Sequence, residues 1–157
     1  MNSQSSSLTI NTSWLSFEAI SNYIKWHQPI SIAAEAEKNI TNCHRFLVQH
    51  LQHSNELIYG VNTGFGFLQN VKISSQQIEE LQYNLLQSHA CGVGNEVPKE
   101  IVRLMLMLKI KSLSYGNSGV QVSTVNRLTE MHNYNILSLQ AVLMILTLVV
   151  TPIVMLV

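Results

Sequence analysis

The chain has 157 residues, of which 46% are apolar and 11% are charged. This length and apolar content suffice for one folded domain with a buried core. Nine Lys and Arg balance nine Asp and Glu, so the formal net charge is zero. Binding to DNA or RNA depends on a basic surface, and we therefore expect no nucleic-acid partner. All nine acidic residues are Glu, which excludes a Ser-His-Asp triad and the Asp-rich calcium loops.

The amino-terminal residues 1–8 are polar, rich in Ser and without periodic apolar positions. We expect a mobile tail there. The tail has no apolar core of the signal-peptide type, so we expect a cytoplasmic protein. Cys43 and Cys91 have no C-x-x-C partner, and the six histidines form no H-E-x-x-H pattern. The sequence thus predicts no metal site.

Helical spacing of apolar residues, together with helix start signals, predicts four helices. They are expected at 31–51, capped by Ser31, from Ser74 onward, at 98–113, and from Ser123 onward. Gln77 stands three residues after Ser74, as in a capping box. The third helix has an unbroken Leu and Met run at 104–108, so we expect it to be surrounded on most sides. No strand alternation of useful length appears, and the predicted fold class is all-α.

A glycine-rich loop is predicted at residues 59–66, where Tyr59 precedes Gly60, Gly64 and Gly66. Three glycines at this density are incompatible with a helix interior, because each costs about 1 kcal/mol relative to Ala. The pattern G-x-G-x-x-G fails at Gln69, and no Walker Lys-Ser/Thr follows, so the loop does not match a nucleotide cradle. With few apolar anchors, it is expected to be mobile in the isolated chain.

The carboxy-terminal segment 136–157 differs in composition from the rest, because it contains no Lys, Arg, Asp or Glu. Its apolar part is just long enough to span a bilayer but has no flanking Trp, Tyr, Lys or Arg after it. Three interpretations stay open: a membrane anchor, a buried helix of a larger protein, and an aberrant terminus from a shifted reading frame or splice. Of these we favour the last, so no membrane partner is expected.

Two blocks of sequence carry a family resemblance. Residues 59–66 read YGVNTGFG and residues 84–94 read NLLQSHACGVG, with supporting stretches at 112–120 and 124–128. In order and spacing these blocks resemble the amino-terminal part of the aromatic amino acid ammonia-lyases, over residues 9–135. The best match is the histidine ammonia-lyase branch, because phenylalanine and tyrosine lyases carry Phe-Leu or His-Leu where this chain has Ser88-His89.

The resemblance implies an all-α carbon-nitrogen lyase of histidine catabolism, which converts histidine to urocanate and ammonia as a homo-oligomer, a tetramer in the family. By position in the motif, Tyr59 is the expected base for the β-proton and His89 the expected partner of the substrate imidazole. Gly60 would let backbone come near the substrate. Gly64, Gly66 and Asn84 are expected to be structural.

One departure from the family concerns the cofactor. The family's electrophile is a methylidene-imidazolone formed from the protein's own Ala-Ser-Gly, and this tripeptide is absent from the chain. The resemblance therefore implies that this chain is inactive alone. Two alternatives remain: a non-enzymatic, tail-anchored membrane or interaction protein, and within the family a phenylalanine or tyrosine ammonia-lyase.

Overall fold

The computed structural model describes residues 7–64, 66–74, 77, 80–81, 83–84, 87–88 and 95–136. In this part the chain is mainly helical and has one two-stranded sheet, which confirms the predicted all-α class. The helix expected from Ser74 lies partly outside the described residues. Those of its residues that are described are helical, and the Ser74 hydroxyl donates to Gln77 Oε1 at 2.9 Å.

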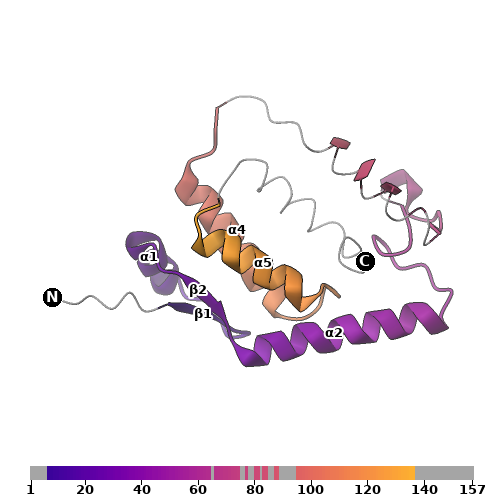
Figure 1. Cartoon of the computed structure of the whole chain (residues 1–157), viewed down its shortest axis with the longest axis horizontal. Coiled ribbons are helices and arrows are strands. Elements are labelled where there is room, and N and C mark those ends of the chain that lie inside the picture. Colours follow the sequence, from indigo (N-terminus) through magenta and orange to yellow (C-terminus); the bar gives the residue numbers. More distant parts are fainter. Residues whose placement is uncertain are drawn as a thin grey trace.

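A small parallel sheet opens the described chain (Figure 1). Strand β1 (Leu8–Ile10) pairs with β2 (Ile30–Ile32), and Leu8 lies opposite Ile30. This corrects two predictions, because Leu8 belongs to a strand rather than to a tail, and Ser31 lies in β2 rather than at a helix cap. Each strand has only three residues, and its partner lies far away in sequence. Neither strand can therefore be recognised from alternation.

Helix α1 (Phe17–Trp26) connects the two strands and was not predicted. Parallel strands need such a crossover. The helix begins because Ser16 Oγ accepts the Ala19 N–H at 3.1 Å, a side-chain cap on an otherwise unpaired donor. It ends at His27, whose left-handed φ of 47° turns the chain back toward β2.

Helix α2 (Ala34–His53) follows β2 and begins three residues later than the predicted start at Ser31, with Ala33 as its N-cap. Its buried positions are Ala36 and Ile40 near the start. Farther along, His44 Nδ1 lies 2.9 Å from the Gly119 carbonyl oxygen, which ties the helix to the turn between the last two helices. As Figure 1 shows, α2 leads away from the sheet toward the loop that follows residue 53.

Helices α4 (Lys99–Ser114) and α5 (Val122–Asn133) lie side by side and form the centre of the structure (Figure 1). Pro98 precedes α4 as its N-cap. The hydrophobic core draws on all four of these helices and on both strands, and its members are Ile10, Tyr23, Ile30, Ile40, Leu106, Met107, Ile110, Leu113, Val120, Val125 and Leu128. Burial of apolar side chains from elements this far apart in sequence supplies most of the stabilisation.

Helix α4 is surrounded on most sides, as predicted, and one of its faces stays open to solvent. Ile101 is 48% exposed and Leu108 is 42% exposed, whereas Leu106, Met107 and Ile110 are fully buried. The sequence run of Leu and Met hides this difference, because hydrophobicity alone does not tell a core face from an apolar face left open.

A buried polar cluster joins three helices. The Tyr23 hydroxyl of α1 lies 2.5 Å from His132 Nε2 of α5, and both side chains are almost fully buried. Asn133 Oδ1 accepts the Ile30 N–H and lies 2.9 Å from His132 Nδ1. Because this oxygen can only accept, Nδ1 carries the proton of the neutral ring, and Nε2 accepts from Tyr23.

Arg103 of α4 completes this cluster. Its Nη1 donates to Asn135 Oδ1 at 2.8 Å, and its Nη2 donates to the carbonyl oxygens of His27 and Gln28 at 3.1 and 3.3 Å. These carbonyls lie at the carboxyl end of α1, where a positive charge is favourable. Burial raises the pKa of Tyr23 to about 12, against the opposing effect of Arg103. Burial also lowers the pKa of His132, and the charge of Arg103 adds to this.

The lowered pKa of His132 predicts acid sensitivity. The unfolded chain takes up a proton at this residue below its ordinary pKa of about 6.5, whereas the folded chain resists it, so stability is retained above that pH and lost as the pH falls. Denaturant unfolding followed by circular dichroism should give a lower free energy of unfolding at pH 5 than at pH 7.5. His132→Gln should reduce this difference. His53→Gln, at an exposed histidine, is the matched control and should keep it. An unchanged difference in His132→Gln would contradict the assignment.

Candidate active site

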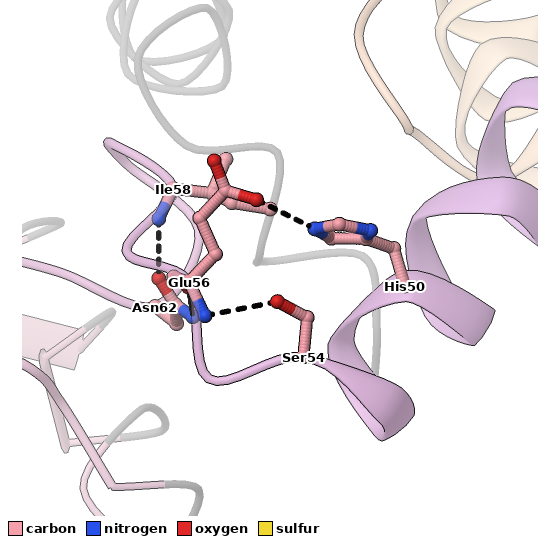
Figure 2. Close-up of polar contacts among 5 residues, drawn as sticks. All are labelled: His50, Ser54, Glu56, Ile58 and Asn62. Carbon is pink, nitrogen blue, oxygen red and sulfur yellow. Dashed lines mark hydrogen bonds and ion pairs between the residues drawn. The ribbon is translucent and has the colours of Figure 1, made fainter.

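The loop that carries Tyr59 begins where α2 ends. The Ser54 hydroxyl oxygen accepts the Glu56 N–H at 3.0 Å, and the Glu56 carboxylate lies 3.1 Å from His50 Nε2, one turn before the end of α2 (Figure 2). Both partners are partly open to solvent, so this ion pair adds little stability. It lies where the loop leaves the helix.

Tyr59 itself lies in a tight turn. The Ile58 carbonyl oxygen accepts the N–H groups of Val61 and Asn62 at 3.0 and 3.2 Å, which closes the chain around Tyr59 and Gly60. Gly60 has a φ of 70°, a left-handed conformation that glycine adopts without steric cost. Gly60 is buried, whereas the Tyr59 side chain is 57% exposed. The turn therefore presents the tyrosine at the surface over a buried backbone.

The second half of the loop is anchored to residues 71–73. Thr63 is buried and pairs with Lys72 in an isolated antiparallel bridge. Gly64 N–H donates to the Val71 carbonyl oxygen at 3.1 Å, and Ile73 N–H donates to that of Asn62 at 2.9 Å. The sequence predicts few apolar anchors for this loop, and these backbone hydrogen bonds are polar anchors that the prediction does not include. Its backbone hydrogen bonds offset part of the entropy lost on ordering it.

Gly64 and Gly66 differ in the reason that each is glycine. A Cβ at Gly64 would lie 2.6 Å from Leu68 Cβ and 2.9 Å from the Leu68 carbonyl oxygen, whereas a Cβ at Gly66 would meet nothing within 4 Å. Gly66 instead has a φ of +55° and opens the short 3-10 helix η1 (Gly66–Leu68). Gly64 therefore permits a close approach, and Gly66 permits a left-handed turn.

The other predicted site residues lie beyond this loop. Asn84 is exposed in the helical segment that precedes Ser88. His89 falls outside the described residues, and so does Cys91. The structure thus brings together Tyr59, Gly60 and Gly64, while the position of His89 relative to them stays a prediction.

Two residues of the loop were missed by the sequence reasoning. Asn62 and Thr63 make most of its side-chain hydrogen bonds, with Thr63 Oγ1 accepting from Gly60 N–H at 3.3 Å and donating to the Gly64 carbonyl oxygen at 3.0 Å. A usable signal was present, since Asn and Thr beside glycine commonly hydrogen-bond to nearby backbone.

A separate hollow of about 190 Å³ lies on the β1 side of the molecule, away from Tyr59, and is lined by residues 8–11, 13–15 and Lys111. The Lys111 ammonium donates to the carbonyl oxygens of Asn11 and Ser13 at 2.5 and 2.8 Å. Its nitrogen also lies 4.2 Å from the centre of the Tyr115 ring. The ammonium thus already has partners from this chain, and the hollow contains none of the predicted site residues.

Comparison with known proteins places these features in a family. The sequence profile described as aromatic amino acid lyase matches residues 15–139, which is most of the chain. The chain belongs to the aromatic amino acid lyase family. The matched range includes the Tyr59 loop and the whole of α4 and α5, and it ends shortly after the predicted boundary at residue 135.

Relatives in this family include histidine ammonia-lyase of Deinococcus radiodurans, 39% identical over 119 residues, which cover 76% of this chain and 22% of that protein. Among solved structures, Pantoea agglomerans phenylalanine aminomutase has a TM-score of 0.76 at 30% identity and covers 82% of this chain and 25% of that one. Histidine ammonia-lyase from Trypanosoma cruzi has a TM-score of 0.69 at 29% identity, and the match covers 82% of this chain and 24% of that one. The chain thus spans about a quarter of these relatives.

Two further features of the described residues concern membranes and metal ions. No helix among them is both long enough and apolar enough to cross a membrane. The described part also contains no group of three or more His, Cys or Glu side chains placed to hold a metal ion. The apolar segment 137–157 lies outside the described residues, so the interpretations offered for it remain untested.

The contrast between Gly64 and Gly66 yields a matched pair of variants. Gly64→Asn should destabilise the loop by about 1–3 kcal/mol, because its Cβ would overlap Leu68. Gly66→Asn should cost less than about 1 kcal/mol, because Asn tolerates a positive φ and has open space there. Hydrogen exchange at the amide of residue 64, which bonds to the Val71 carbonyl oxygen, measures the effect of each substitution on the loop. Equal exchange in the two variants would contradict the close approach at Gly64.

Proposed function

We propose that this chain is the amino-terminal segment of a histidine ammonia-lyase, whose reaction is the elimination of ammonia from histidine to give urocanate. The observation that carries the proposal is the Tyr59 turn, an exposed tyrosine held over a buried, hydrogen-bonded backbone. It occurs within a region that is 39% identical to a histidine ammonia-lyase.

In this proposal Tyr59 removes the proton from the substrate β-carbon. The electron pair of that C–H bond becomes the new carbon–carbon double bond, and the amine leaves from the α-carbon as ammonia. A base contributes only part of the acceleration, typically 10²–10⁴-fold. Gly60 would allow the backbone beside Tyr59 to lie close to the substrate, because it carries no side chain.

The choice of histidine as substrate rests on Ser88-His89, with His89 as the proposed hydrogen-bond partner of the substrate imidazole. The similarity to a phenylalanine aminomutase keeps phenylalanine as the alternative substrate. As in the family, we propose a homo-oligomer in the cytoplasm, with completion of the site by other parts of a full-length lyase.

The family's electrophile does not fit this chain. It forms from Ala-Ser-Gly, and the sequence contains no such tripeptide. The chemistry that activates the amine must therefore come from outside these residues, and the contribution proposed for this chain is confined to Tyr59, Gly60 and His89.

The first test measures the activity of the chain alone. Purified protein incubated with histidine should form no urocanate, followed as ultraviolet absorbance, because a base without an activated leaving group does not lower the barrier enough. A full-length histidine ammonia-lyase under the same conditions is the positive control. Turnover that copurifies with the chain and is lost in Tyr59→Phe would contradict the prediction.

The second test completes the enzyme. Grafting residues 1–135 onto the remainder of a histidine ammonia-lyase should restore activity. In this chimera Tyr59→Phe should lower kcat by at least about 100-fold with little change in KM, as expected for a group acting in the chemical step. His89→Leu should raise KM for histidine and shift the preference toward phenylalanine or tyrosine. An active chimera that tolerates Tyr59→Phe would show that the base is misassigned.

A further inference from the structure

We infer that Asn62 is a positioning residue for Tyr59, an inference that rests on the proposed role of Tyr59 as the base. Asn62 follows Tyr59 by three residues in the turn, and each of its hydrogen-bonding groups is engaged. Figure 2 shows its side chain beside the backbone of residues 56–58, which precede Tyr59.

The Asn62 side chain connects the segment before Tyr59 to the segment after it. Its Oδ1 accepts the Ile58 N–H at 2.7 Å, and its Nδ2 donates to the Glu56 carbonyl oxygen at 2.8 Å. Two parallel bonds from a planar amide fix both the distance and the orientation of the backbone they hold. Movement of the Glu56–Leu57 or Leu57–Ile58 peptide, which lead into Tyr59, therefore requires the loss of at least one of them.

The Asn62 backbone extends this connection in two directions. Its N–H donates to the Ile58 carbonyl oxygen at 3.2 Å, and its own carbonyl oxygen accepts the Ile73 N–H at 2.9 Å. The first bond closes the turn, and the second ties the turn to the segment behind it. On the opposite side, the Glu56 carboxylate reaches His50 on α2 at 3.1 Å. Asn62 thus bonds to the segment that follows α2 and to the segment at Ile73, and Tyr59 lies in the turn between Ile58 and Asn62.

The exposure of Tyr59 explains why Asn62 would affect the position of its side chain. More than half of the tyrosine side chain is open to solvent, so core packing places it only in part. The backbone of the turn therefore contributes to the position of the side chain. A catalytic group displaced by about 1 Å can lose about 100-fold in rate.

Hydrogen exchange by NMR on the full 157-residue chain tests the structural half of this inference. Asn62→Ala should speed exchange of the Ile58 amide by about tenfold, the equivalent of one hydrogen bond. Asn62→Asp keeps an acceptor for that amide and should preserve its protection. Lys72→Met, which removes only the bond from Lys72 to Asn55, is the matched control and should leave Ile58 unchanged.

The amides of Leu106 and Ile110 in the core of α4 report on overall stability in the same spectra. They should exchange equally in all variants. If Asn62→Ala leaves Ile58 unchanged, or speeds α4 and Ile58 alike, the inference is overturned, because Asn62 would then be either dispensable or a general stabiliser.

Kinetics in the chimera test the functional half. Asn62→Ala should lower kcat by about 10- to 100-fold, with KM changed less than about threefold. If Asn62 acts through Tyr59, adding Asn62→Ala to Tyr59→Phe should cost no further activity. Full additivity, or an unchanged kcat in Asn62→Ala, would overturn the inference. A chimera that is inactive with both residues intact counts against the proposed function instead, and the exchange result then decides whether Asn62 holds the turn.

Discussion

Burial of one face of α4 is the constraint on which the rest of this structure depends. Leu106, Met107 and Ile110 are fully removed from solvent, and the elements packed against α4 come from both sides in the sequence, with β1 and α2 before it and α5 after it. A three-residue strand is not stable alone, and helices in proteins draw most of their stability from tertiary packing. Their order in space therefore follows from the need to cover this single apolar face.

Polar groups inside this packing make it specific. Tyr23, Arg103 and His132 come from three helices, and their bonds leave few arrangements in which all are paired. One atom of this cluster, Arg103 Nε, is buried without a partner within the described residues. Buried polar networks are costly when incomplete, so this cluster limits how α1 can sit against α4 and α5. Through Asn133, which contacts His132 and bonds the Ile30 backbone, the cluster also holds β2, the strand that leads into α2.

The sequence predicted those features whose cause is local. Helices α2, α4 and α5 have apolar positions at helical spacing and were located to within a few residues, and the glycines identified the loop at Tyr59. The strands were missed because three residues carry no periodicity, and their partners are set by tertiary packing. The Tyr23–His132 bond joins residues 109 apart, which no local pattern reveals. Asn62 was missed because its four bonds depend on the path of the backbone around it.

The central claim is that this segment supplies a lyase with its base on a turn held by its own backbone. A crystal structure of the chimera with a bound histidine analogue tests it most directly. We expect the Tyr59 hydroxyl oxygen within about 3.5 Å of the analogue's β-carbon, with the Asn62 bonds to residues 56 and 58 intact. A Tyr59 side chain turned away from the analogue, with another basic group at the β-carbon, would contradict the account.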